Sequence, residues 1–302
     1  MPPITRRQLL ATGLPAAAGA AGLAAAAHFA RRYGLIPPDH GGLYGPGETL
    51  TYAAQRLLAS HAPAREFPRS MISKAPFANE VAPPSDAFKR HQATGFSDWR
   101  LIVDGMVANP ASLSLSDLRS LPFRSQITEV ACEEGWSYIA EWIGTPLSEV
   151  LSAVGVLPHA RYIVYRSIQT DWWDSLDMAD ALHPYTYLTW GMNDGDLPVG
   201  FGGPLRMRVP RQLGYKSIKY ITNLTATDNI KAFGKGLGSA SPEGGYAWYA
   251  GICRPCAAGA TRASHQKRGL SNNYAATCCD FLMNASRSAL ISSACVVNIP
   301  CG

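Results

Sequence analysis

Three signatures of common enzyme classes are missing from this 302-residue chain. It has no G-x-G-x-x-G and no G-x-x-x-x-G-K-[ST] loop, so dinucleotide and ATP chemistry have no support. It also has no C-x-x-C-H, the motif that attaches a c-type haem. Only 16% of the residues are charged and 47% are hydrophobic, a balance typical of a globular protein with a sizeable core.

Acidic residues are scarce at both ends of the chain. Residues 1–32 hold four arginines and no acid, and residues 253–302 carry a net charge of +4. Because the whole chain is at +5, residues 33–252 are mildly acidic, at −3. Nucleic-acid-binding proteins instead gather basic residues on the folded body. The charge distribution therefore excludes nucleic acid as the expected partner.

A strongly apolar run of the length needed to cross a membrane is missing as well. Residues 1–30 instead carry Arg6 and Arg7 in the stretch TRRQLL, followed by a long run of Ala and Gly. This pattern is typical of a twin-arginine export signal, and the small residues 24–26 offer a cleavage site. We therefore expect a periplasmic protein, or a membrane-tethered one if the segment is not cleaved.

Cysteine is nearly absent from the body of the chain, where Cys132 is the only one before Cys253. A lone cysteine often only packs in the core. It can also be a nucleophile, but spacing places neither His159 nor His183 beside it as a base. The third interpretation is a soft ligand for a metal whose other ligands come from a cofactor. The residue types alone leave these three interpretations open.

The six other cysteines all lie in residues 253–302. They form a C-x-x-C, an adjacent pair and two single cysteines, a spacing that matches no metal site we can identify. The segment is either foreign to the evolved fold, a disulfide-stapled appendage or a metal site. We favour the first interpretation and expect residues 253–302 to lie outside the domain.

The hydrophobic pattern predicts more strands than helices, in an order that does not alternate regularly. This favours an α+β fold with a β-rich mixed sheet or barrel core and peripheral helices. We expect an irregular region at 31–95 and the main domain at 96–252. Strands are predicted at 99–107, 125–132, 161–168, 204–210 and 215–228, and helices at 47–61, 114–122 and 145–155.

The helix predicted at 145–155 has clear end signals. Thr145 is expected to cap it, Pro146 to take its first position and Gly155 to end it. Such local chemistry makes this the best-defined helix in the sequence.

Residues 201–221, FGGPLRMRVPRQLGYKSIKYI, concentrate glycines and basic residues. Strand alternation places Arg206 and Arg208 on the face opposite Leu205, Met207 and Val209. A glycine turn with backbone amides and lysines follows. Converging cations and free N–H groups are what a phosphate group needs. The alternative is a solvated, charged edge strand.

Five blocks in this order resemble the sulfite-oxidase-fold molybdopterin-dependent oxidoreductases, and within them the periplasmic protein-methionine-sulfoxide reductase (MsrP-like) branch. The resemblance covers residues 75–250 and follows an export signal of the kind used for cofactor-loaded proteins. The blocks are WRLIVDGMVANPASLSLSDLRSLP, EVACEEGWSYIAEWIGTPLSEVL, ARYIVYRSI, LDMADALHPYTYLTWGMNDGDLP and GGPLRMRVPRQLGYKSIKYI.

The resemblance implies a molybdenum–molybdopterin cofactor and assigns residues to it. Cys132 corresponds to the molybdenum ligand, and Arg206 to the arginine that binds the cofactor phosphate or lines the site. The remaining implied cofactor contacts are Asn79, Ser167, Lys216, Ser217, Ile218 and Lys219.

This chain departs from the family pattern at several positions. Phe201 stands where relatives carry Asn or His, so one polar contact to the cofactor is lost or supplied elsewhere. Glu133 and Glu134 follow the cysteine, where sulfite oxidases place neutral and basic residues. Two carboxylates repel an oxyanion, which argues against sulfite and for a neutral oxide. Trp172 and Trp173 either shape the substrate mouth or pack in the core.

The function implied is oxygen-atom transfer, namely reduction of S- or N-oxides such as methionine sulfoxide. The substrate is either a small molecule or protein-bound. Electrons are expected from a membrane haem subunit or another electron-transfer protein. The alternatives are oxidation of the sulfite dehydrogenase type and a non-catalytic binding protein that retains the fold.

Overall fold

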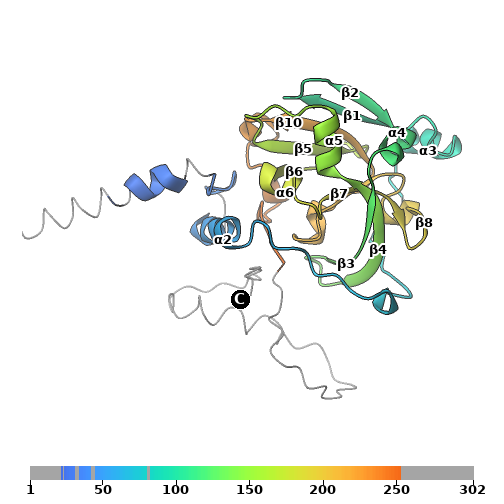
Figure 1. Cartoon of the computed structure of the whole chain (residues 1–302), viewed down its shortest axis with the longest axis horizontal. Coiled ribbons are helices and arrows are strands. Elements are labelled where there is room, and N and C mark those ends of the chain that lie inside the picture. The colour runs from blue at the N-terminus through green and yellow to red at the C-terminus, as the bar shows by residue number, and fades with distance from the viewer. Residues whose placement is uncertain (1–21, 23, 31–33, 42–44, 80–81, 253–302) are drawn as a thin grey trace, which may run out of the picture.

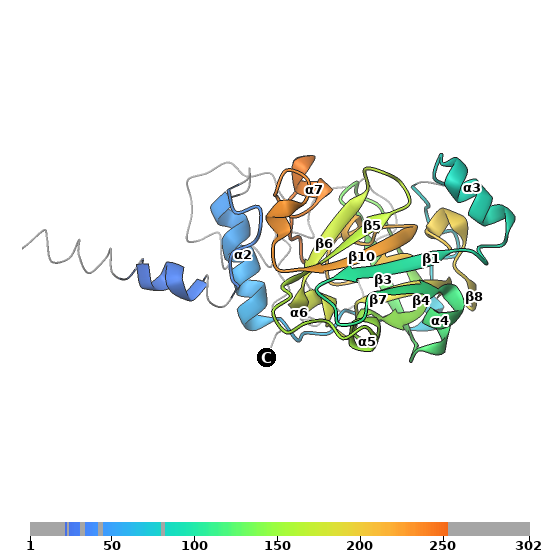
Figure 2. The same cartoon turned by 90° about the horizontal axis from the view of Figure 1, so that it is seen from above.

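The computed structural model describes residues 22, 24–30, 34–41, 45–79 and 82–252. Two five-stranded sheets form the body, with short helices around them (Figures 1 and 2). The expected α+β class with a mixed sheet and peripheral helices is confirmed. The predicted export signal lies largely, and the cysteine-rich tail wholly, outside the described residues.

The first sheet has the order β2-β1-β10-β5-β6. Its β1–β10 pair is parallel, with Ile102 opposite Asn223, and its other pairs are antiparallel. Strands that are distant in sequence therefore lie side by side. The bounds are β1 Arg100–Gly105, β2 Ala111–Ser114, β5 Tyr162–Ser167, β6 Trp173–Asp177 and β10 Ile221–Thr227.

The second sheet has the order β3-β4-β7-β8, and β9 also pairs with β7. All of its pairs are antiparallel. The β3–β4 hairpin places Cys132 in its turn, directly after the last paired residue of β3. The bounds are β3 Arg124–Ala131, β4 Ser137–Pro146, β7 Tyr187–Met192, β8 Gly195–Asp196 and β9 Arg206–Arg208.

The main hydrophobic core collects side chains from both sheets and from the helix α5. Leu205, Met207 and Val209 belong to it and are at most 1% exposed, so the predicted alternation of this segment is confirmed. The helices are α2 Gly45–Leu58, α3 Asp86–Ala93, α4 Leu115–Ser120, α5 Leu147–Ala153, α6 Met178–Ala181 and α7 Ala240–Glu243. None of the helices in the described residues is both long and apolar enough to span a bilayer.

Capping residues near in sequence explain where α4 begins, but they do not explain where α5 begins. Ser114 and Asp117 form a reciprocal capping box on α4. The predicted cap of α5 is wrong: Thr145 ends up inside β4, and its hydroxyl donates to the backbone of Leu118 at 2.7 Å. Strand pairing of residue 145 with Leu188 overrides the capping preference.

The predicted strand at 215–228 is also partly wrong. Residues Gly214–Lys216 form a 3₁₀ turn, and the strand β10 begins only at Ile221. The turn places the chain against the β3–β4 hairpin instead of continuing the sheet.

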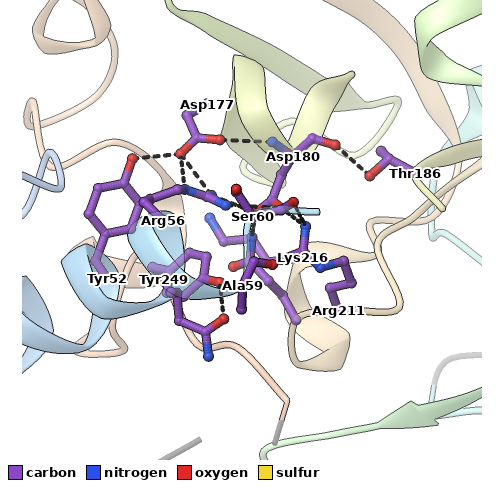
Figure 3. Close-up of polar contacts among 12 residues, drawn as sticks. Tyr52, Arg56, Ala59, Ser60, Asp177, Asp180, Thr186, Arg211, Lys216 and Tyr249 are labelled. Atoms are coloured by element: carbon purple, nitrogen blue, oxygen red, sulfur yellow. Dashed lines mark hydrogen bonds and ion pairs between the residues drawn. The ribbon is translucent and has the colours of Figure 1, made fainter. Parts of the chain in front are cut away.

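Helix α2 lies at one end of the molecule and docks through buried charges (Figures 2 and 3). Arg56 contacts Asp177 and Asp180 at 2.7 Å each. Asp180, 1% exposed, also accepts from Arg211 at 3.2 Å and from Gln212 at 2.6 Å. These partners compensate a carboxylate that would be costly to bury alone, and they hold its pKa down, at about 2.

A second buried contact joins this region to residues 248–249. Glu48 accepts from the Tyr249 amide at 2.9 Å, and Asp39 accepts from the Trp248 amide at 2.7 Å. Burial, followed by the neighbouring carboxyl of Asp39, raises the pKa of Glu48 to about 9. The Glu48 carboxyl is therefore protonated at neutral pH.

This pair predicts a pH-dependent stability. Because the folded-state pKa of Glu48 lies above its unfolded value, the stabilisation is complete below about pH 4.5 and is lost as the pH rises toward 9. We expect the Glu48 carboxyl alone to lower the free energy of unfolding by about 4 kcal/mol between pH 6 and pH 9. Glu48→Gln should flatten this slope in urea titrations, whereas Glu149→Gln on α5 should keep it. An unchanged slope in Glu48→Gln would contradict the raised pKa of Glu48.

Candidate active site

One open pocket brings together most of the residues expected to bind the cofactor. It lies where the β3–β4 turn meets the segment 201–219 and the β5–β6 turn. Six of the eight predicted residues line it, namely Asn79, Cys132, Arg206, Ser217, Ile218 and Lys219. The other lining residues are Glu133, Glu134, Trp136, Gln169, Trp172, Gly214 and Tyr215.

Cys132 is held by the tight turn after β3. Its amide donates to the carbonyl of Trp136 at 2.9 Å, and its carbonyl accepts from Gly135, whose φ of 90° suits glycine. The Sγ atom lies 3.2 Å from Oε2 of Glu133 and 3.8 Å from Oε2 of Glu134. The side chain therefore faces a pocket and is not core filling.

The surroundings of Cys132 oppose a free thiolate. Burial is the main cause that raises the pKa of the thiol to about 12, and the hydrogen bond to Glu133 and the two carboxylate charges add to it. None of the described pocket residues is a histidine. His183 instead lies beside Asp180, near Arg211, where burial lowers its pKa to about 4. A cysteine–histidine nucleophile is therefore not what this geometry forms.

Arg206 enters the pocket from β9 and is fixed by backbone carbonyls. Its Nε donates to Ser217 at 2.9 Å and its Nη1 to Phe201 at 3.0 Å, and its guanidinium lies over the Trp142 ring. Two of its five N–H donors serve these two bonds, which leaves others for an anion. Arg206 is only 4% exposed, so the solvated edge strand considered for this segment is not observed.

Arg208, which the sequence placed on the same strand face as Arg206 but which was not assigned to the cofactor, lies outside the pocket lining and bonds to residues near it. It is fully buried and donates to the hydroxyls of Thr128 and Ser217 and to the carbonyl of Glu129. Burial and the charge of Arg206 lower its pKa to about 9. The R-x-R spacing could have identified it as a partner of Arg206.

The turn at 214–219 approaches Cys132 closely. A Cβ at Gly214 would lie 3.3 Å from the carbonyl oxygen of Ala131, tighter than an ordinary contact, so a side chain there would push the turn away. The Ser217 hydroxyl accepts from the amide of Val209 at 3.1 Å. Lys219 donates from Nζ to the carbonyl of Gly200 at 2.7 Å.

Two predicted residues lie outside the pocket lining. Lys216 is buried, donates to Asp174 at 2.5 Å and to Ser175 at 3.1 Å, and lies over the Trp248 ring. Ser167 is buried at the end of β5, and its hydroxyl accepts from the amide of Gln169 at 3.1 Å. Ser217, directly after Lys216, and Gln169, two residues after Ser167, line the pocket instead.

Lys216 and Lys219 have different surroundings, so we expect different effects when each is replaced. Lys216→Met should leave Asp174 buried without its cation and lower the free energy of unfolding by about 3 kcal/mol. Lys219→Met should cost less than about 1 kcal/mol, because Lys219 is only half-buried. Urea unfolding of both variants checks this. Equal stability losses would show that Lys216 is not held as the structure indicates.

The aromatic residues near the site divide into two groups. Phe201 packs edge-on against Tyr138, with ring centroids 5.6 Å apart, so it fills space where relatives place a polar group. Trp173 packs against Phe233. Trp172 lines the pocket and is 54% exposed. One tryptophan is therefore at the mouth and the other is structural.

The donor set of the pocket fits a molybdopterin group. It offers one thiol, two cations and a buried serine. It also has a turn in which Gly214 allows a close approach to the β3–β4 turn. Among the described residues there is no cluster of three His, Cys, Asp or Glu side chains that could hold a metal unaided. A metal here would therefore need ligands from a cofactor, and the cations lie where a phosphate can be bound.

The comparison with known protein families agrees with this geometry. Residues 89–232 match the family model described as the oxidoreductase molybdopterin binding domain. This segment of the chain therefore carries a molybdopterin-binding oxidoreductase domain, which implies a molybdenum–molybdopterin cofactor.

Particular relatives lie in the methionine-sulfoxide reductase group. The chain is 36% identical over 185 residues to a protein of Azospira oryzae named as a protein-methionine-sulfoxide reductase subunit, YedZ1, covering 61% of this chain and 66% of that one. It is 34% identical over 169 residues to the protein-methionine-sulfoxide reductase catalytic subunit MsrP of Xanthomonas campestris, covering 51% and 52%. The chain thus spans less than two thirds of the length of each of these relatives.

Among solved structures, the sulfane dehydrogenase SoxCD from Paracoccus pantotrophus is a match. Its TM-score is 0.42 at 22% identity, and the match covers 44% of this chain and 39% of that one.

Proposed function

We propose that this chain is the catalytic subunit of an exported molybdenum enzyme that reduces S- or N-oxides by oxygen-atom transfer. The observation that carries the proposal is the shared pocket. Within a molybdopterin-binding domain, it places the thiol of Cys132 together with Arg206, Ser217 and Lys219.

The residues of the pocket have distinct parts in this reaction. The molybdenum–molybdopterin group, when bound, supplies the two-electron oxygen-atom chemistry. Cys132 would hold the metal through its sulfur, and Oε2 of Glu133, 3.2 Å from Sγ, is placed to accept the thiol proton. Arg206 and Lys219 would hold the phosphate, because charge-assisted bonds to phosphate are strong. The net reaction converts R₂SO, two electrons and two protons into R₂S and water.

A neutral oxide is the substrate class that the carboxylates support. Glu133 and Glu134 lie beside the thiol, where they repel a sulfite anion. The names of the relatives point to methionine sulfoxide. The electrons come from a separate redox protein, a membrane haem subunit, and the segment with Arg6 and Arg7 directs export to the periplasm by the twin-arginine route.

Metal analysis and turnover together test the proposal. Protein purified from a host that makes molybdopterin should hold about one molybdenum per chain. It should reduce sulfoxides or N-oxides with a viologen dye and should not oxidise sulfite. Well-folded protein with less than about a tenth of an equivalent of molybdenum would favour a non-catalytic binding protein.

A further inference from the structure

The mouth of the pocket has a rim formed by Glu133, Glu134, Trp136 and Trp172, which we call the acidic–aromatic rim. All four residues line the pocket, and the carboxylates of Glu133 and Glu134 lie 3.2 and 3.8 Å from the sulfur of Cys132. They come from two hairpin turns, β3–β4 and β5–β6. The phosphate-side cations come from a different segment, residues 206–219.

Trp172 is an exposed indole on a fixed backbone. Its side chain is 54% exposed, yet its carbonyl accepts from Ser167 at 2.9 Å and its amide donates to Gln169 at 3.2 Å. A large apolar ring kept in solvent at the edge of a pocket is available to a ligand.

Trp136 lines the same pocket and orients a carboxylate. It stacks on Tyr138 at 5.9 Å with an interplanar angle of 10°, and it contacts the exposed Phe77 at 5.2 Å. Its Nε1 donates to Oε2 of Glu134 at 2.7 Å. The carboxylate of Glu134 is thus held in a set direction at the mouth.

The cations and the carboxylates of the pocket have different partners. Arg206 and Lys219 donate to backbone carbonyls within residues 200–217, whereas Glu133 and Glu134 lie beside the thiol. A cofactor phosphate bound by Arg206 and Lys219 would neutralise their charge. The carboxylates of Glu133 and Glu134 would then leave a negative potential at the mouth, where a substrate enters. Asp171, next to Trp172 and exposed, adds to it.

We propose that the acidic–aromatic rim selects sulfoxides flanked by positive charge, such as an oxidised thioether next to lysine or arginine in a peptide, and that Trp172 is the specificity-determining residue. This rests on the function proposed above. Sulfur–aromatic and cation–π contacts favour the indole rings, and complementary charge favours a basic partner over an acidic one.

Two matched peptides test this selection. One carries methionine sulfoxide between lysines and the other between glutamates, and dimethyl sulfoxide serves as a substrate without flanking charge. With molybdenum-loaded protein and a viologen dye, kcat/KM should be on the order of tenfold higher for the lysine peptide. The preference should shrink at high salt because the charges at the mouth are screened.

Three variants and one binding measurement show which residues cause the preference for the lysine peptide, and they separate this preference from turnover. Glu134→Gln should reduce the preference several-fold, and Trp172→Ala should raise KM for both peptides more than for dimethyl sulfoxide. Phe123→Ala, which removes a similarly exposed aromatic ring outside the pocket, should change neither. Tryptophan fluorescence can measure the binding of the reduced peptides, and it should show the same charge preference without turnover.

The outcomes distinguish the two proposals. Protein that reduces dimethyl sulfoxide and both peptides equally well would overturn the rim selection and leave the proposed function standing. Loaded protein that reduces none of the oxides but binds the lysine peptide more tightly would overturn the function and support the rim. Equal binding of both reduced peptides would overturn the proposed selection by the rim, whether or not the protein reduces oxides.

Discussion

Cys132→Ser should lower kcat for oxide reduction by at least about 100-fold in molybdenum-loaded protein. A serine hydroxyl is a hard, weakly acidic ligand and cannot replace a thiolate on a soft, redox-active metal. The substitution keeps the size of the side chain and the turn bonds of the backbone at 132. The loss is therefore expected in turnover and in the molybdenum spectrum, measured with a viologen dye and by metal-edge absorption.

Stability measurements provide the control for this variant. Because Cys132 is only half-buried, the serine variant should unfold within about 1 kcal/mol of wild type. Glu149→Gln, on α5 outside the pocket lining, should retain wild-type turnover. Retained oxide reduction by a folded serine variant would show that another residue holds the metal.

Arg56→Met should lower the free energy of unfolding by about 4–5 kcal/mol. Arg56 is the shared partner of Asp177 and Asp180, and removing it leaves two buried carboxylates with too few cations (Figure 3). The contacts of Tyr52 and Tyr249 with the guanidinium, at 5.0 and 4.9 Å from the ring centres, are lost as well. Urea unfolding at pH 7 measures the effect.

An exposed arginine gives the matched comparison. Arg119 pairs with Asp196 at 2.7 Å, but both side chains are largely solvated. Arg119→Met should therefore cost less than about 1 kcal/mol. Similar losses in the two variants would mean that the Arg56 network does not fix α2 to the domain.

The sequence predicted those parts of the fold that depend on local patterns. Alternation placed Met207 in the core and Arg206 on the other face, and the helix predicted at 114–122 corresponds to α4. One short segment, 206–219, holds four of the six predicted residues that line the pocket. Motif resemblance assigned these four residues, and Cys132 from another part of the chain, to the same cofactor.

What could not be predicted depends on partners far away in sequence. The pairing of β4 with β7 turned Thr145 into a strand residue, although its local signal was that of a helix cap. Asp174 draws Lys216 away from the pocket, and no pattern near residue 216 shows that. The assignment of Lys216 and Ser167 as cofactor contacts stays a prediction, and the structure shows only that both lie close in sequence to residues that line the pocket.

The docking of α2 also has a consequence for the order of assembly. Arg56 contacts residues 121 and 124 positions further along the chain, and Arg211 bonds back to Ser60 across 151 positions. During synthesis, α2 emerges long before any of these partners exists. This early helix is thus fixed only when nearly the whole domain is complete, so a protease that cleaves undocked α2 would report how far folding has advanced.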